Sequence, residues 1–139
     1  MDAKEYLKTI EKINAEIENL KEERIRLQFD KYTLGSPSLG EKVQCFTDPD
    51  KMAQIAIKTE KLENRIADKM MELMETRMNI LNQIHQLRNS DQIKVLYKRY
   101  MELKGWKEIA EECGYGERQI HNIHGQGLKE FAAIIERLQ

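Results

Sequence analysis

The feature that most constrains the fold is a stripe of apolar residues that recurs at intervals of four and three near the start of the chain. Its members are Tyr6, Ile10, Ile13, Ile17, Leu20 and Leu27, with Arg24 at the remaining position. This heptad spacing is typical of a helix that packs one stripe against a partner helix. It predicts a helix over residues 2–29.

A second apolar stripe runs from about residue 50 to residue 87. Its members are Met52, Ile55, Thr59, Leu62, Ile66, Met70, Leu73, Ile80, Ile84 and Leu87, with Arg77 inside the stripe. The changed interval after Ile66 predicts a local stutter in the packing. Two long helices of this kind predict a long antiparallel helical hairpin, a coiled coil, over residues 1–88. The alternative is a coiled coil with a second copy of the chain, which makes a homo-oligomer a candidate assembly.

The segment 30–50 between the two stripes lacks a helical period and is rich in Gly, Ser and Pro. It is longer than an ordinary connection between helices. One interpretation is a flexible connector with a single apolar anchor at residues 43–46, and the other is a loop with its own function.

Composition excludes several classes of protein. Gly (7) and Pro (2) are few among the 139 residues, which favours an all-α fold. The longest aliphatic run, Ala132–Ile135, is too short to span a membrane, and the first thirty residues contain no apolar signal region. Cys45 and Cys113 fit neither a disulfide nor a zinc pattern. We therefore expect a cytoplasmic protein that binds no membrane, metal or cofactor, and the absence of catalytic motifs predicts that it is not an enzyme.

Residues 91–139 form a second predicted domain with shorter helices and turn glycines. A helix over 106–113, a glycine turn and a helix over 117–138 predict a helix-turn-helix. Such a motif needs a small residue where the helices cross, a Gly at the sharp turn and a branched apolar residue beyond it, and Ala110, Gly114 and Ile120 have this spacing. Trp106 is expected to fill the core of this domain.

The second helix of this motif carries polar residues on the face opposite its apolar stripe. Arg can fork onto guanine, Asn and Gln can pair with adenine, and Glu can accept from the cytosine amino group. The residues predicted to contact DNA are Lys107, Glu117, Arg118, Gln119, His121, Asn122 and Gln126. Glu117 has an equal alternative as a residue that favours the helix dipole.

Two further features of this helix have alternative interpretations. His121 and His124 could form a metal pair, but no third ligand is nearby, so a DNA-facing His121 and a structural His124 are expected. Gly125 and Gly127 are unfavourable inside a helix. Tight packing against other helices is the expected reason, and close approach to a DNA backbone is the alternative.

The runs 95–100, 105–110 and 113–120, followed by Ile123-His124 and Leu128-Lys129, resemble region 4 of sigma-70 family factors. The whole arrangement also resembles phage and prophage transcriptional regulators of the ArpU/RinA kind. The resemblance implies promoter binding by the helix over 117–138, with double-stranded DNA as a partner and RNA polymerase as a second candidate partner. It also implies a role in phage late transcription inside a bacterial host cell. Gly116 departs from the region 4 pattern, which has a capping Ser or Thr there.

Three functions are compatible with these patterns: a sequence-specific DNA-binding transcriptional regulator, a DNA-packaging adaptor like a terminase small subunit, and a region 4-like module that binds protein without DNA. The charge distribution bears on all three. Residues 91–139 contain 8 basic and 8 acidic residues, so neither part of this chain, whose net charge is −1, is a basic domain. Long-range electrostatics should therefore contribute little to DNA binding, and a second copy or the polymerase would supply the remaining affinity.

Overall fold

A computed structural model describes residues 2–35 and 49–138, and every regular element in these two ranges is helical. The prediction of an all-α chain is therefore confirmed. None of the helices in these ranges has the length and apolarity that a membrane span requires. The elements are α1 (Ala3–Leu7), α2 (Thr9–Gly35), α3 (Pro49–Ile84), α4 (Ser90–Leu96), the π-helical turn η1 (Tyr97–Met101), α5 (Trp106–Cys113) and α6 (Glu117–Leu138).

The chain divides into two compact units that do not follow the boundary expected at residues 88–91. One unit contains residues 15–71, and the other joins the described residues of 1–14 to those of 72–139. The difference has a physical reason. The first turns of the N-terminal helical segment and the last turns of α3 bury their apolar side chains together with the C-terminal helices. Local periodicity cannot report such long-range packing.

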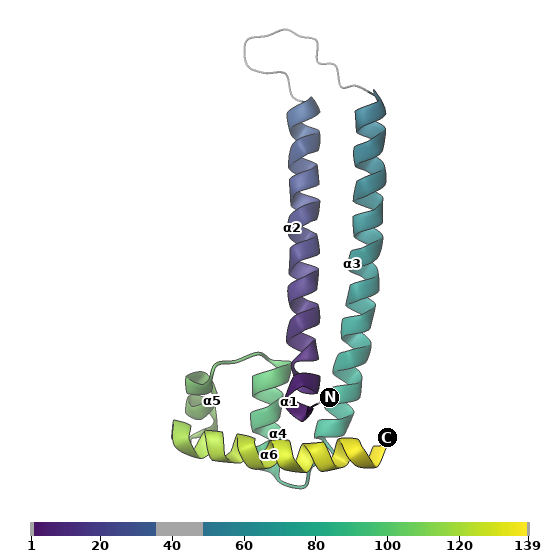
Figure 1. Ribbon diagram of the computed structural model, residues 1–139. Coiled ribbons are helices and arrows are strands. Elements are labelled where there is room, and N and C mark those ends of the chain that lie inside the picture. The colour runs from purple at the N-terminus through teal and green to yellow at the C-terminus, as the bar shows by residue number, and fades with distance from the viewer. Residues whose placement is uncertain (1, 36–48, 139) are drawn as a thin grey trace. The chain divides into compact units, whose positions relative to one another are not determined.

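In the unit of residues 15–71, parts of α2 and α3 lie side by side (Figure 1), and an ion pair joins Lys69 Nζ to Glu16 Oε2 at 2.7 Å. Ile17 and Ile66 are buried as the apolar stripes predict. The predicted position of Met70 is wrong, because its side chain is 50% exposed. Lys69 is the half-buried residue at this level instead, so the stripe continues at an interval of three after Ile66.

The helix bounds also differ from the expected ones. A short break at Lys8 separates α1 from α2, where the Thr9 hydroxyl donates to the Tyr6 carbonyl oxygen at 2.6 Å. Helix α2 continues past residue 29 to Gly35, and α3 begins at Pro49. Of the loop expected over 30–50, the segment 36–48, with the anchor at 43–46, lies outside the described residues.

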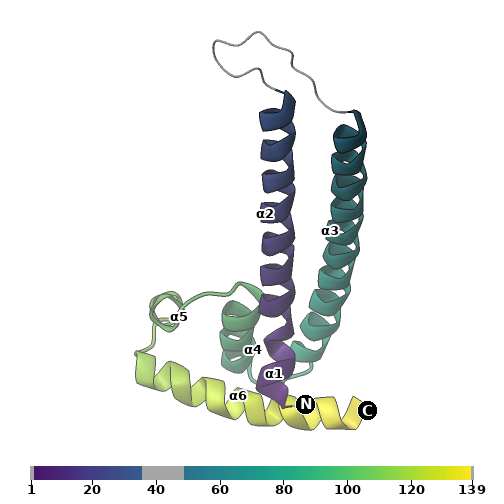
Figure 2. The ribbon, with the colours of Figure 1, turned by 45° about the horizontal axis from the view of Figure 1, so that its top comes forward.

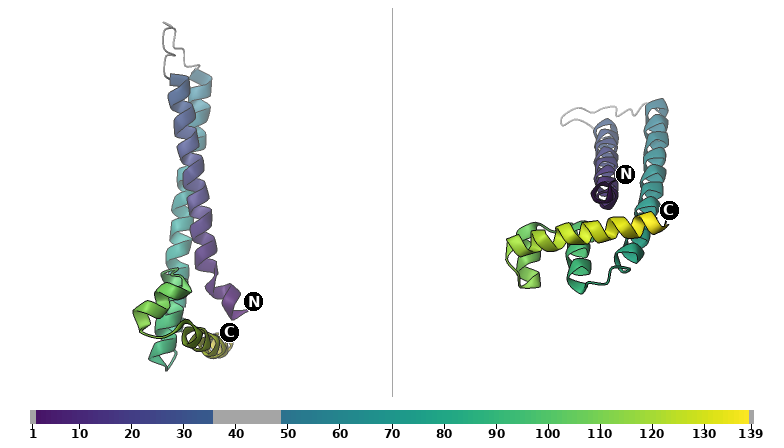
Figure 3. Two further views of the ribbon diagram at one scale, coloured as in Figure 1. Left: turned by 90° about the vertical axis from the view of Figure 1, so that its left-hand side faces the viewer. Right: turned by 60° about the horizontal axis from the view of Figure 1, so that its bottom comes forward.

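The other unit is organised around α6, which lies across α1, α4 and α5 (Figures 1 and 3). Tyr6 illustrates how the N-terminal segment joins this core. Its ring stacks on Phe131 with centroids 6.2 Å apart, and its hydroxyl donates to Gln83 Oε1 at 2.7 Å. The main cluster of buried residues comprises Ala3, Leu7, Ile10, Ile80, Ile84, Leu87, Leu96, Tyr100, Met101, Phe131 and Ile134.

Helix α4 has a side-chain cap at its start. Asn89 is the N-cap, and its Oδ1 accepts from the backbone N–H groups of Asp91 at 2.9 Å and Gln92 at 3.2 Å. Such a cap satisfies N–H groups that have no partner inside the helix. Leu103 is 41% exposed and adopts a positive φ of 57° where the chain leaves η1.

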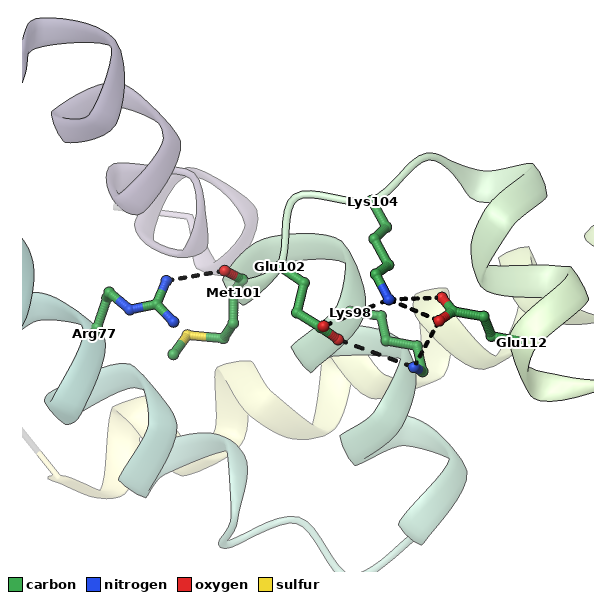
Figure 4. Close-up of polar contacts among 6 residues, drawn as sticks. All are labelled: Arg77, Lys98, Met101, Glu102, Lys104 and Glu112. Carbon is green, nitrogen blue, oxygen red and sulfur yellow. Dashed lines mark hydrogen bonds and ion pairs between the residues drawn. The ribbon is translucent and has the colours of Figure 1, made fainter. Parts of the chain in front are cut away.

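Arg77 occupies an apolar-stripe position of α3 because it caps another element. Its Nη1 donates to the Met101 carbonyl oxygen at 2.9 Å, at the C-terminal end of η1 (Figure 4). Carbonyl groups in the last turn of a helix lack partners within that helix, and a cation there also favours the helix dipole. The guanidinium therefore ties the end of α3 to the π-helical turn.

Candidate nucleic-acid interface

The helices α5 and α6 meet at a tight turn at one end of α6 (Figure 2). Gly114 ends α5 in the left-handed conformation, with φ 74° and ψ 25°, which side chains with a Cβ rarely adopt. The backbone N–H groups of Gly114 and Tyr115 both donate to the Ala110 carbonyl oxygen, at 3.0 and 3.1 Å. The sequence therefore places its glycine where the backbone requires one.

A small second core holds this pair of helices together. Val95, Ile109, Ala110 and Ile120 are buried in it, and the partly buried side chains that pack against it are Trp106, Cys113, Tyr115 and Ile123. Ala110 and Ile120 of the predicted motif thus lie in this core, together with Val95 of α4. The Tyr115 hydroxyl also donates to Asp91 Oδ2 at 2.9 Å, which ties the turn to the first residues of α4 and raises the pKa of Tyr115.

Six of the seven residues predicted to contact DNA lie on α6, and the structure exposes all of them. These six are Glu117, Arg118, Gln119, His121, Asn122 and Gln126. The seventh, Lys107, is exposed in the first turn of α5. Within residues 2–35 and 49–138, none of these side chains makes a hydrogen bond or an ion pair, so their donors and acceptors are available to a ligand.

An aromatic cluster lies behind this exposed face. The Trp106 ring lies 4.5 Å from the His121 ring and 4.6 Å from the His124 ring, measured between centroids. Trp106 is only partly buried, so it borders the small core rather than filling it as predicted. Cζ of Arg99 lies 4.4 Å from the centroid of the Trp106 ring, a cation–π contact.

The structure gives His124 an internal role, and the sequence analysis did not identify its partner. His124 is 8% exposed, and its Nε2 shares a hydrogen bond of 2.7 Å with the Tyr100 hydroxyl. Burial raises the pKa of Tyr100 to about 12 and lowers the pKa of His124 to about 4, with Lys4 and Arg99 adding to the latter shift. His124 is therefore neutral at physiological pH.

Four charged side chains beside α5 form a network that sequence reasoning missed (Figure 4). Lys104 Nζ lies 2.7 Å from Glu112 Oε1 and 3.4 Å from Glu102 Oε2. Lys98 Nζ lies 3.6 Å from Glu112 and 3.9 Å from Glu102. The hydrogen bond with Lys104 lowers the pKa of Glu112 and raises that of Lys104. Lys98 and Lys104 thus both have carboxylate partners close by.

The two glycines inside α6 have different surroundings. A Cβ on Gly127 would lie 3.4 Å from Gln92 Cβ and 3.6 Å from Leu96 Cδ1, whereas a Cβ on Gly125 would meet nothing within 4 Å. The expected tight packing against α4 is therefore present at Gly127 and absent at Gly125. At Gly125 the alternative, close approach of a DNA backbone, stays a prediction.

Over the described residues, no group of three or more His, Cys, Asp or Glu side chains is placed to hold a metal ion. Comparison with models of known protein families, with curated proteins and with solved structures finds no match to this chain.

Proposed function

We propose that this protein is a sequence-specific DNA-binding transcriptional regulator that reads the major groove with α6. In this proposal, α5, the Gly114 turn and α6 act as a helix-turn-helix, as the resemblance to region 4 of sigma-70 factors implies. The observation that carries the proposal is a row of exposed polar residues on α6 whose side chains make no hydrogen bond or ion pair among the described residues. These residues are Glu117, Arg118, Gln119, His121, Asn122 and Gln126. Polar groups of this kind match the edges of bases in the major groove.

The charge balance shapes the expected mode of binding. Lys98 and Lys104 lie beside Glu102 and Glu112, so fewer basic side chains are available for phosphate contacts than the composition suggests. A single copy should therefore bind DNA weakly and with a shallow dependence on salt. Either a second copy, joined through a coiled-coil hairpin formed by α2 and α3, or RNA polymerase would supply the missing affinity. The resemblance to the ArpU/RinA kind implies that this regulator is encoded by a phage or prophage and acts on a late promoter.

The first experiment selects sequences from a pool of random DNA duplexes with the full-length chain. We expect wild type to enrich one motif and to bind it more tightly than a scrambled duplex in a fluorescence anisotropy titration. Arg118→Ala should lose about 1–3 kcal/mol on the enriched duplex, because a forked contact to guanine contributes that much. Arg137→Ala, an exposed arginine in the last turn of the same helix, is the matched control and should bind as wild type does.

Phosphate contacts are counted separately by repeating the titration at several salt concentrations. Lys107→Ala should reduce the slope of log affinity against log salt by about 0.9, the release of roughly one counterion. Lys94→Ala, an exposed lysine on α4, is the control for a general loss of charge. An unchanged slope in the Lys107→Ala variant would show that Lys107 makes no phosphate contact.

Two other functions predict different results. A DNA-packaging adaptor like a terminase small subunit should form a ring of about eight or more subunits, which light scattering would detect, whereas a regulator should be a monomer or a dimer. A module that docks on polymerase through protein alone should be retained by polymerase in a pull-down and show no preference among duplexes. Either of these results, together with equal binding by wild type and Arg118→Ala, would refute the proposal.

A further inference from the structure

His121 differs from the other exposed polar residues of α6 because its side chain has a fixed support. Its imidazole ring packs on the Trp106 ring at a centroid distance of 4.5 Å, with the two planes tilted by 44°. Over the parts of the chain that the structure describes, the side chains of Glu117, Arg118 and Asn122 make no hydrogen bond, ion pair or ring contact. His121, one of the residues predicted to contact DNA, is therefore held in place in the absence of DNA.

Trp106 is itself held on two sides. Cζ of Arg99 lies 4.4 Å from the centroid of its ring, and the ring of buried His124 meets it edge-on at 4.6 Å. Arg99 is fixed in turn, because its Nη1 donates to the Lys104 carbonyl oxygen at 3.0 Å. The indole ring therefore sits between groups that are anchored in η1 and α6, and it provides a rigid surface for His121.

A side chain that is already ordered loses less conformational entropy when it binds. A hydrogen-bond donor that is held in one position also bonds poorly to an acceptor in a different position, which adds specificity. We propose that Trp106 is a positioning residue for DNA recognition: it holds His121 so that the imidazole N–H donates to guanine N7 or O6 at one base pair. Guanine is the base that offers two acceptors on its major-groove edge. This inference rests on the proposed function, and it assigns one base preference to the Arg99–Trp106–His121 stack.

The test is selection from random duplexes with full-length wild type and the variants Trp106→Leu, Trp106→Phe, His121→Ala and Arg118→Ala. We expect Trp106→Leu and His121→Ala to lose the guanine preference at the same single position, from roughly tenfold to about twofold. Trp106→Phe should retain most of it, because a phenyl ring also supports the imidazole. Arg118→Ala should lose preference at a different position.

Three results would overturn the inference. If Trp106→Leu weakens preference evenly at all positions, the residue only stabilises the fold. If His121→Ala and Trp106→Leu affect different positions, the two residues do not act together. If wild type enriches no motif, the proposed function fails and this inference fails with it.

An NMR measurement without DNA separates failure of the stack from failure of the proposed function. The ring current of the indole should shift the His121 ring protons upfield in wild type and move them back in Trp106→Leu. His121 ring-proton resonances without an upfield shift in wild type would show that the stack is absent in solution. A shifted resonance in a protein that enriches no motif would leave the stack intact and would refute DNA recognition alone.

Discussion

The buried His124 should make the stability of this protein depend on pH between about pH 4 and pH 6.5. Its pKa is lowered from 6.5 to about 4 in the folded chain, mainly by burial, with contributions from Lys4, Arg99 and His121. An unfolded chain binds a proton at this ring below pH 6.5, whereas the folded chain does so only below about pH 4. The folded state therefore loses stability as the pH falls through this window.

The size of the effect follows from the two pKa values. Each unit of difference corresponds to about 1.4 kcal/mol, so the full penalty approaches about 3 kcal/mol below pH 4. Between pH 7.5 and pH 5 the free energy of unfolding should fall by about 2 kcal/mol because of His124 alone. A shared hydrogen bond with Tyr100, 2.7 Å long, keeps the neutral ring in its buried position.

Urea unfolding followed by circular dichroism at pH 7.5 and pH 5 measures this change. His124→Gln, which can still bond to Tyr100, should be less stable than wild type at pH 7.5 but should lose about 2 kcal/mol less on acidification. His85→Gln changes an exposed histidine just beyond the end of α3 and is the matched control. If His124→Gln retains the full pH dependence of wild type, the burial argument is refuted.

Three further predictions concern packing, and thermal or urea unfolding checks each of them. Leu7→Ala should destabilise the unit that contains α6 by about 2–5 kcal/mol because Leu7 is fully buried, whereas Leu20→Ala should cost less; equal small losses would contradict the shared core. Gly125→Ala should stabilise the folded protein by up to about 1 kcal/mol, and Gly127→Leu should destabilise it by about 1–3 kcal/mol. A destabilising Gly125→Ala together with a stabilising Gly127→Leu would refute the packing described for these glycines. Arg77→Met should cost about 1.5 kcal/mol, because a carbonyl group loses its charged donor; an unchanged midpoint would show that the bond contributes nothing.

Local patterns in the sequence predicted local structure well. The bounds of α5 and α6, the left-handed Gly114 and the buried Ile120 all follow from spacing, because each depends on residues within a few turns of one another. Heptad spacing likewise identified the inward faces of α2 and α3 at Ile17 and Ile66. These features need no knowledge of distant contacts.

Features that depend on distant contacts were missed. Tyr6 and Leu7 belong to the same helical segment as the heptad stripe, and nothing local indicates that they pack in the core that includes Phe131. The ion pairs of Lys104 with Glu102 and Glu112 require the bend after η1 to bring separate segments together. Opposite charges around a predicted turn were the only available signal, and such charges are common on helix surfaces.

The candidate interface was predicted as a list of exposed residues, but not as an arrangement. Periodicity alone placed Arg118 and Asn122 on the outward face of α6. It could not show that His121 would pack on Trp106, because this contact depends on the angle between α5 and α6. The structure thus gives His121 a defined side-chain orientation, which the sequence did not predict.

We propose that the exposed face of α6 recognises a DNA sequence. The most direct test of this proposal is a competition titration in which wild type, bound to its enriched duplex, is challenged with unlabelled enriched and scrambled duplexes. Sequence-specific recognition predicts that the enriched duplex competes at least tenfold better, and that Arg118→Ala loses most of this advantage while Arg137→Ala keeps it. Equal competition by both duplexes against wild type would contradict the claim.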